Sequence, residues 1–178
     1  MEERQKMIRE RIEEEDFVEL MQLRGVKQIV YDKLTKEKGF HQDEIAIEPR
    51  FGLAFSDCEA TVSMDFIISL HSTSFAVMRC ANSGLEFWER YVIAFARAVK
   101  DYQIPFAMVT NGYEAKIINV LSGDSEGENM ENFYTRQQAV IYMKDFKKIP
   151  CPEKRLEIEK RIIHAFEDIK CPTIKQEK

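Results

Sequence analysis

An aspartate and an arginine on neighbouring apolar runs are the residues of this sequence best placed to do chemistry. Asp65 lies within the largely apolar run 62–70, and Arg79 ends the next run, 74–79. A carboxylate inside a β run is costly to desolvate unless a cation or a hydrogen-bond donor pairs with it. Asp65 is therefore either a functional residue or half of a structural ion pair, and Arg79 is its nearest candidate partner in the sequence.

Other polar residues stand where predicted elements end or pack. Glu48 closes the predicted strand 44–48, and its alternative role is that of a solvated strand residue. Thr110 ends the uncharged run 105–110 and Asn111 follows it. The end of such a strand lies at a crevice where α/β sheets often bind ligands. A plain hairpin turn explains Asn111-Gly112 equally well. Arg97 lies beside the buried face of a helix, from which it could reach a phosphate or cap an acid inside the domain.

The elements that must position these side chains follow from the spacing of apolar residues. Helices are predicted over 2–23, from Val26 to a stop at Gly39, and over 85–102, 135–142 and 153–169, with Gly25 interrupting the first two. Strands are predicted over 44–48, 51–55, 62–70, 74–79, 105–110 and 115–121, and 122–132 is predicted to be a loop. This order indicates an α/β (α+β) domain with a mixed sheet flanked by helices. We divide the chain into a charged N-terminal helix, 1–24, a single domain, 25–170, and a polar tail, 171–178.

Composition excludes several classes of protein. The chain has 178 residues, of which 44% are hydrophobic and 32% charged, as expected of one globular domain. No apolar run reaches the length of a membrane helix, and the charged N-terminus does not resemble a secretory signal, so we expect a cytoplasmic protein without membrane partners. The net charge of −5 argues against a surface that binds DNA everywhere. A local basic patch is compatible with it: Lys147 and Lys148 could follow a nucleic-acid backbone, or form a solvated face.

The four cysteines, Cys58, Cys80, Cys151 and Cys171, show no CxxC spacing. Free buried thiols are the preferred interpretation over a metal site or disulfides.

Residues 24–121 resemble the N-terminal nuclease domain of type I restriction enzyme R subunits and its small stand-alone relatives, within the PD-(D/E)XK superfamily. The resemblance rests on the order and spacing of six pieces. These are the helix exit Gly39-Phe40, the run Ile45-Ala-Ile-Glu-Pro-Arg50, Met64-Asp65, the strand ending at Arg79, Ala96-Arg97, and Val109-Thr-Asn-Gly112. It implies a restriction-endonuclease-like mixed central sheet flanked by helices.

The resemblance also implies a chemistry. In that superfamily an acid on one strand and Glu-x-Lys on the next hold Mg²⁺ beside the scissile phosphate, where the metal activates water. Carried over, Asp65 matches the first acid and Glu48 an upstream acid, so these two are the expected Mg²⁺ ligands. The Glu-x-Lys motif falls on Val77-Met78-Arg79. Val77 removes a carboxylate, and Arg79 keeps the charge without the compact ammonium of lysine. Met64 also departs from the proline common there.

We therefore interpret the nuclease site as degenerate and expect a DNA-binding or partner-binding role. Any surviving cleavage would be Mg²⁺-dependent, with Asp65 and Glu48 as ligands and Arg79 stabilising charge; a shifted register could bring Glu59 into the pocket. Arg97, Thr110, Asn111, Lys147 and Lys148 are the expected nucleic-acid contacts. The alternative is a non-enzymatic scaffold or regulatory protein that homo-oligomerises or joins a restriction-system subunit. A second acid beside Asp65 favours the nuclease, whereas full occupation of Asp65 by Arg79 favours the scaffold.

Overall fold

A computed structural model describes residues 2–56 and 58–167 of the chain. Its helices are α1 (Glu2–Asp32), α2 (Leu85–Ala98), α3 (Arg136–Lys144) and α4 (Glu153–Phe166). A π-helical segment, η1 (Lys33–Glu37), continues α1, and short 3-10 turns form η2 (Gln42–Glu44) and η3 (Met130–Asn132). The strands are β1 (Ile45–Ile47), β2 (Arg50–Ala54), β3 (Glu59–Ser63), β4 (Phe66–Leu70), β5 (Thr73–Cys80), β6 (Phe106–Thr110), β7 (Glu114–Asn119) and β8 (Ser125–Asn129).

Six strands form one mixed sheet in the order β1-β4-β5-β6-β7-β8. β5 and β6 run parallel because α2 carries the chain back between them, and all the other neighbours in this sheet are antiparallel. β2 and β3 form a separate antiparallel hairpin. The predicted α+β fold with a mixed sheet flanked by helices is confirmed.

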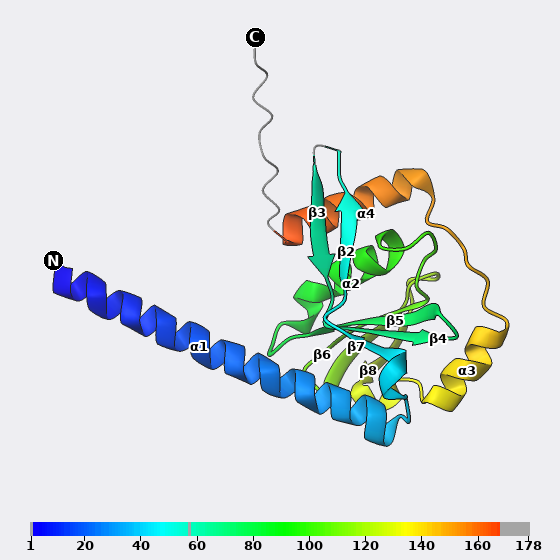
Figure 1. The fold of residues 1–178 in the computed structure, drawn as a ribbon, viewed down its shortest axis with the longest axis horizontal. Coiled ribbons are helices and arrows are strands. Elements are labelled where there is room, and N and C mark those ends of the chain that lie inside the picture. The colour runs from blue at the N-terminus through cyan, green and yellow to red at the C-terminus, as the bar shows by residue number, and fades with distance from the viewer. Residues whose placement is uncertain (1, 57, 168–178) are drawn as a thin grey trace, which may run out of the picture.

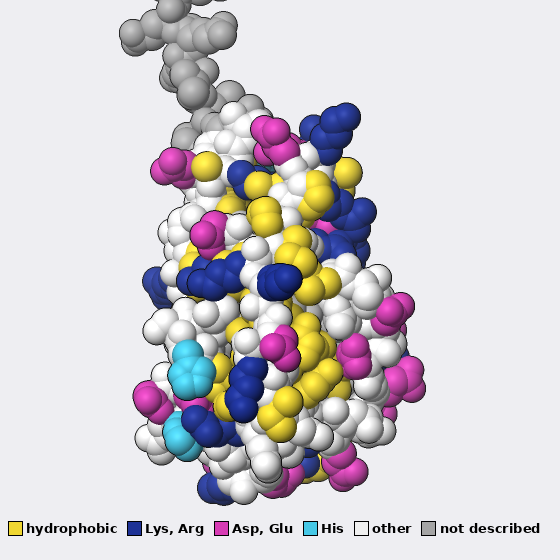
Figure 2. All heavy atoms as spheres, turned by 90° about the vertical axis from the view of Figure 1, so that its right-hand side faces the viewer, with side chains coloured by type: hydrophobic (Ala, Val, Ile, Leu, Met, Phe, Trp, Pro, Cys, Tyr) yellow, Lys and Arg dark blue, Asp and Glu magenta, His cyan; other side chains and the backbone are white. Residues whose placement is uncertain are grey.

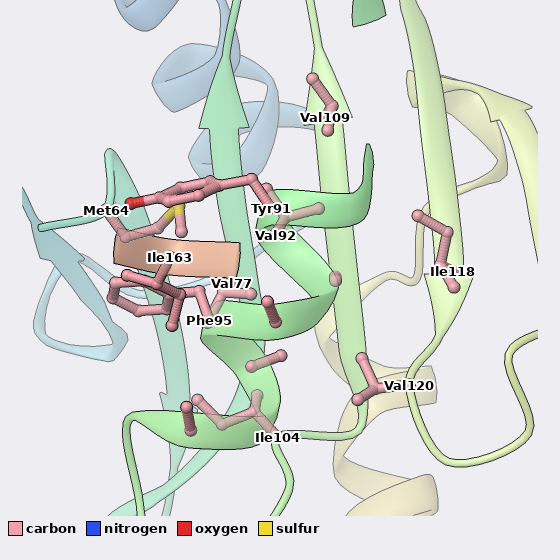
Figure 3. Packing of buried hydrophobic residues seen from close by; sticks show 14 of the residues in the cluster. Met64, Val77, Tyr91, Val92, Phe95, Ile104, Val109, Ile118, Val120 and Ile163 are labelled. Atoms are coloured by element: carbon pink, nitrogen blue, oxygen red, sulfur yellow. The ribbon is translucent and has the colours of Figure 1, made fainter. Parts of the chain in front are cut away.

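Helices cover both faces of the sheet, and each face has its own hydrophobic core (Figure 1). On one face, α2 and α4 pack with the hairpin, and Tyr91, Phe95 and Ile163 lie against Val77 of β5 (Figure 3). On the other face, the C-terminal end of α1 and α3 pack against the sheet, with Val30 among the buried residues. The central strands β4, β5 and β6 are largely apolar because most of their residues are buried on both faces, and Arg79, near the end of β5, is charged.

Three predicted elements differ from the structure, and the first is the break at Gly25. Gly25 does not interrupt the first helix, because α1 runs unbroken from Glu2 to Asp32. A lone glycine costs a helix only about 1 kcal/mol, and packing of the following turns outweighs that cost. The predicted loop 122–132 contains β8 and η3. The polar sequence of this segment did not indicate a strand. β8 is an edge strand that forms through backbone pairing with β7 and not through burial of its side chains.

The predicted strand 62–70 is two strands of different sheets. β3 ends at Ser63 and pairs with β2, whereas β4 starts at Phe66 and pairs with β1 and β5. Met64 and Asp65 form the junction between them. The hairpin begins its second strand at Glu59, opposite Ala54, so Glu59 lies at the far end of the hairpin from this junction.

The cysteines only partly follow the prediction of free thiols. Cys80 and Cys151 are free, but Cys58 is disulfide-bonded, so the prediction is wrong for Cys58. Cys171 and the predicted tail lie outside the described residues. Across the described part of the chain, no helix combines the length and apolarity needed to cross a membrane.

Candidate functional site

Asp65 is buried at the junction of the hairpin and the sheet, and both of its carboxylate oxygens have partners. The Cys80 backbone N–H donates to Oδ2 over 2.7 Å. Lys27 Nζ, which comes from α1, lies 2.8 Å from Oδ1. These two contacts supply what a buried carboxylate needs in place of water.

Lys27 joins Asp65 to a second acid, Glu48. Lys27 Nζ is 2.8 Å from Glu48 Oε1, so one ammonium bridges two carboxylates at equal distances. Burial would lower the pKa of Lys27, but its hydrogen bonds to Asp65 and Glu48 outweigh burial and raise that pKa above its ordinary value. The same hydrogen bond from Lys27 lowers the pKa of Glu48. Lys27 and Glu48 are therefore both charged at neutral pH.

The backbone at Glu48 is also unusual. Glu48 follows β1 directly and has φ of 48°, a left-handed conformation that costs a non-glycine residue about 1–2 kcal/mol. Its N–H donates to the Asp65 carbonyl over 2.9 Å, and its carboxylate binds Lys27. These contacts hold the strained residue in place and fix its carboxylate at the pocket.

The predicted pairing of Asp65 with Arg79 is present but is the longest contact of this carboxylate. In β4 and β5, Phe66 pairs with Met78, so the position before Phe66 faces Arg79 across the strands. Arg79 Nε lies 3.9 Å from Asp65 Oδ2. Its guanidinium packs over the Trp88 ring, 4.5 Å from the centroid, and near Tyr91 at 5.4 Å. The aromatic rings therefore orient Arg79 while leaving its N–H groups only partly used.

A cavity of about 280 Å³ opens beside these side chains. Its walls carry three cations and two carboxylates, together with Leu23, Ser63 and Met64: the charged residues are Lys27, Arg50, Arg79, Glu48 and Asp65. The pocket therefore holds one net positive charge. Because Arg50 is exposed and acts on Glu48 only through its field, its fork of donors is available to a ligand.

The donors of this pocket do not fit Mg²⁺ in the arrangement observed. Mg²⁺ needs near-octahedral oxygen ligands, but Lys27 Nζ lies at the point where Asp65 and Glu48 converge. Val77, where the resemblance led us to expect a motif carboxylate, is fully buried in the hydrophobic core (Figure 3). Within residues 2–56 and 58–167, no group of three or more His, Cys, Asp or Glu side chains is placed to hold a metal ion.

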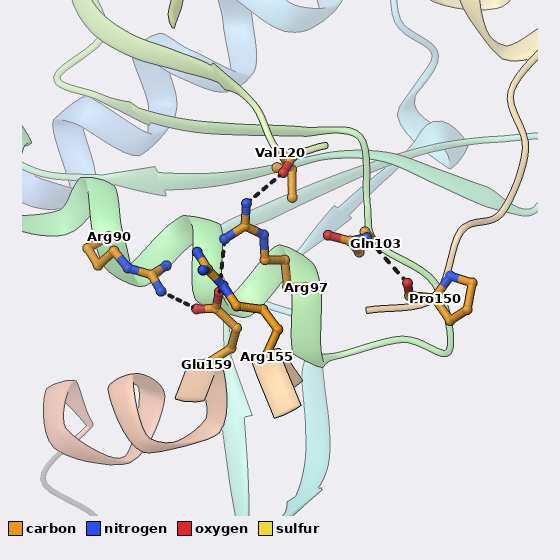
Figure 4. A network of polar contacts seen from close by, with 7 residues as sticks. All are labelled: Arg90, Arg97, Gln103, Val120, Pro150, Arg155 and Glu159. Atoms are coloured by element: carbon orange, nitrogen blue, oxygen red, sulfur yellow. Dashed lines mark hydrogen bonds and ion pairs between the residues drawn. The ribbon is translucent and has the colours of Figure 1, made fainter. Parts of the chain in front are cut away.

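Arg97 serves an acid inside the domain, the second of its two predicted roles. It donates to Glu159 Oε1 over 2.9 Å and to the Val120 carbonyl over 2.9 Å. Glu159 is fully buried and also binds Arg90 and Arg155 (Figure 4). The cluster ties α4 to α2, and Arg97 does not line the Asp65 pocket.

Thr110 and Asn111 build a hairpin. Thr110 is fully buried; its hydroxyl donates to the Glu114 carbonyl and accepts from the Gly112 N–H. Asn111 Oδ1 accepts from the N–H groups of Tyr113 and Glu114. Asn111 lines a separate hollow of about 330 Å³ at the start of α2. Their role as nucleic-acid contacts stays a prediction.

Lys147 and Lys148 lie in the exposed segment between α3 and α4. Lys148 Nζ is 4.9 Å from the centroid of the Tyr102 ring. Figure 2 shows the face that carries α3, where basic and hydrophobic side chains are mixed along the middle and acids are more frequent at the margin. Ile141 of α3 and Ile149 of the segment between α3 and α4 are also exposed. Neither lysine lines the Asp65 pocket, so any contact they make with DNA would be separate from it.

Sequence reasoning missed Lys27, the residue that closes the site. The signal was present: Leu23, Lys27, Val30 and Leu34 follow one another at helical spacing. A lysine within an apolar stripe predicts a buried carboxylate partner. The predicted break at Gly25 hid this stripe by ending the first helix just before Lys27.

A comparison with protein-family models identifies residues 24–133 as matching the family described as type I restriction enzyme R protein N terminus. The matched residues begin within α1, just before Lys27, and end just after η3. They therefore include all five charged residues of the pocket. No curated protein and no solved structure matches the chain.

Proposed function

Because the chain belongs to the family of type I restriction enzyme R protein N termini, we propose that it is a nuclease-like domain that binds the DNA backbone without cleaving it. The Asp65 pocket takes a phosphate, and Arg50 and Arg79 supply the contacts. The family supports a link to DNA, and the side chains of this chain support binding over catalysis.

One observation carries the proposal: Lys27 Nζ lies 2.8 Å from both Asp65 and Glu48. In a metal-dependent nuclease two such carboxylates would share a divalent cation. Here a covalently attached ammonium takes that position and neutralises one of the two acids. The pocket keeps a net positive charge, and Val77 stands where the Glu-x-Lys motif of the nuclease superfamily would have a carboxylate.

The two arginines suit a phosphate better than lysine would. A guanidinium donates two parallel N–H bonds to phosphate oxygens, and it is less strongly hydrated than an ammonium. Arg79 is already oriented by Trp88, with its centroid contact at 4.5 Å, so it loses little conformational freedom on binding. The partners implied are DNA and another subunit of a restriction system.

Binding should be measured by fluorescence anisotropy with single-stranded and duplex DNA over a range of salt concentrations. We expect Arg50→Ala and Arg79→Ala each to weaken binding by roughly tenfold and to lower the salt dependence by about one counterion. Arg161→Ala, which removes an exposed arginine of α4, is the matched control and should change little. Unchanged affinity in both pocket variants would refute the phosphate site.

Cleavage is tested separately with supercoiled plasmid in Mg²⁺ or Mn²⁺. We expect no nicking above that of a preparation carrying Asp65→Ala. Metal-dependent nicking that Asp65→Ala abolishes would replace this proposal with a working nuclease, in which Lys27 yields its place to the metal.

The second candidate function is a non-enzymatic scaffold that forms homo-oligomers. It is favoured by the large hydrophobic side chains exposed along α1, including Phe17, of which 62% is exposed.

A further inference from the structure

The N-terminal two thirds of α1 extends away from the domain (Figure 1). Every residue from Arg4 to Gln22 is exposed, whereas Leu23 begins the part that packs on the sheet. Seven large hydrophobic side chains of this arm are between 47% and 62% exposed: Met7, Ile8, Ile12, Phe17, Val18, Leu20 and Met21. Large apolar side chains exposed in this number along one helix mark an interaction site.

From Arg4 to Glu19 the charges of the arm are divided into two blocks around Ile12, and Glu2 and Glu3 precede the basic block. Residues 4–11 carry four cations, Arg4, Lys6, Arg9 and Arg11, and one acid, Glu10. Residues 13–19 carry five acids, Glu13, Glu14, Glu15, Asp16 and Glu19, and no cation. Pairs within the helix, such as Lys6 with Glu10 at 3.8 Å, use only part of this charge.

This division selects both the partner and its direction. If two arms paired in parallel, each acidic block would meet the same acidic block, which is repulsive. If they pair antiparallel about a two-fold axis near Ile12, the basic block of each copy meets the acidic block of the other. A two-fold axis makes the two halves of such an interface identical, as in most homodimers.

A groove at the base of the arm continues this surface onto the domain. It has a volume of about 330 Å³ and is formed between α1 and the segment before and at the start of α2. Leu20, Leu23 and Trp88 give it an apolar floor, and Asp16 and Glu19 give it an acidic rim. An antiparallel partner would bring Arg4, Lys6 and Met7 to this place, with cations for the rim and an apolar side chain for the floor.

We propose that two copies of this chain dimerise through antiparallel pairing of their α1 arms, with the basic end of each arm seated against the groove of the other copy. The paired helices overlap for about 30 Å at the helical rise of 1.5 Å per residue. The pairing uses none of the five charged residues of the Asp65 pocket, so dimerisation and DNA binding can fail independently.

The test is the mass of the full chain in solution, by light scattering after size exclusion and by sedimentation at several concentrations. The unmodified chain should form a dimer, twice its 20.9 kDa. Variant Arg9→Glu/Arg11→Glu, whose residues 4–11 change from net +3 to net −1, and variant Glu13→Lys/Glu14→Lys/Glu15→Lys, whose residues 13–19 change from net −5 to net +1, should each dissociate at least tenfold more readily. An equimolar mixture of the two should form heterodimers.

The decisive variant combines all five changes, which reverses the sign of both blocks, to net −1 over residues 4–11 and net +1 over residues 13–19; this is the exchanged-block variant. Antiparallel pairing predicts that it forms homodimers again. The control, Glu153→Lys/Glu157→Lys on exposed positions of α4, changes the net charge without touching the arm and should stay dimeric. Circular dichroism shows whether each variant keeps its fold. A monomeric unmodified chain, or an exchanged-block variant that stays monomeric while folded, would overturn the proposal.

Discussion

Replacing Lys27 by methionine removes the ammonium between Asp65 and Glu48 while keeping the length and the apolar stem of the side chain. Asp65, whose side chain is only 9% exposed, then keeps the Cys80 N–H and the distant Arg79 as its partners. Glu48 is largely exposed and regains water. The loss of stability therefore arises mainly at Asp65.

The magnitude lies between two known limits. An exposed ion pair contributes about 0–1 kcal/mol, whereas removing one partner of a fully buried pair costs about 3–5 kcal/mol. With Lys27 24% exposed and Asp65 9% exposed, we expect a loss of about 1–3 kcal/mol. For a chain of this size that lowers the midpoint of thermal unfolding by about 3–9 °C. Asp65→Asn in the same chain should recover most of the loss, because no unpaired charge then remains.

A divalent cation should distinguish the variant from the unmodified protein. Lys27→Met leaves two carboxylates that face one vacated position, so Mn²⁺ or Mg²⁺ should stabilise the variant. A cation at a hundred times its dissociation constant adds about 2.7 kcal/mol, enough to restore the midpoint. The unmodified chain should gain little, since Lys27 fills the position.

The assay is thermal unfolding followed by circular dichroism, with Mn²⁺, with Mg²⁺ and with a chelator. Lys33→Met is the matched control, because Lys33 begins η1, which continues α1, and pairs with Glu37, which is exposed. Two results would refute the reasoning: a Lys27→Met midpoint equal to that of the unmodified chain, or equal stabilisation of both proteins by Mn²⁺.

Three further predictions concern residues that hold the domain together outside the Asp65 pocket. Glu159→Gln should lose about 3–5 kcal/mol in denaturant unfolding, because three arginines would face a neutral side chain at a fully buried position. Burial favours a raised pKa for Glu159, but hydrogen bonds from those arginines hold its pKa below the ordinary 4.5. The stability that ionised Glu159 contributes is therefore present above pH 4.5 and is lost as the pH falls through the lowered pKa. Acid titration of stability should show this step in the unmodified chain and a smaller step in Glu159→Gln. Gly112→Ala should cost about 1–3 kcal/mol more than Gly123→Ala, because both positions have positive φ but only the first would place a Cβ 2.8 Å from Ile29 Cγ2; equal midpoints for these two variants would contradict the clash.

The sequence predicted the sheet, because apolar runs and turn residues report burial and chain reversal directly. The runs at β4, β5 and β6 are largely apolar on both faces, as expected of strands in a sheet that is covered on both sides. It failed at β8, because backbone pairing with β7 and not side-chain burial makes that segment a strand.

Within the site, the sequence by itself determined that Asp65 is a buried charge needing a partner and that Val77 cannot bind a metal. It also indicated Arg79, because adjacent antiparallel strands bring residues at a fixed offset together. Only the tertiary structure decided that Lys27 is the closest cation. Lys27 is 38 positions before Asp65 in the chain, and what brings them together is the packing of an unbroken α1 across the sheet. Local propensity cannot report such a contact, because the contact depends on packing between segments far apart in the chain. That packing keeps α1 helical through Gly25.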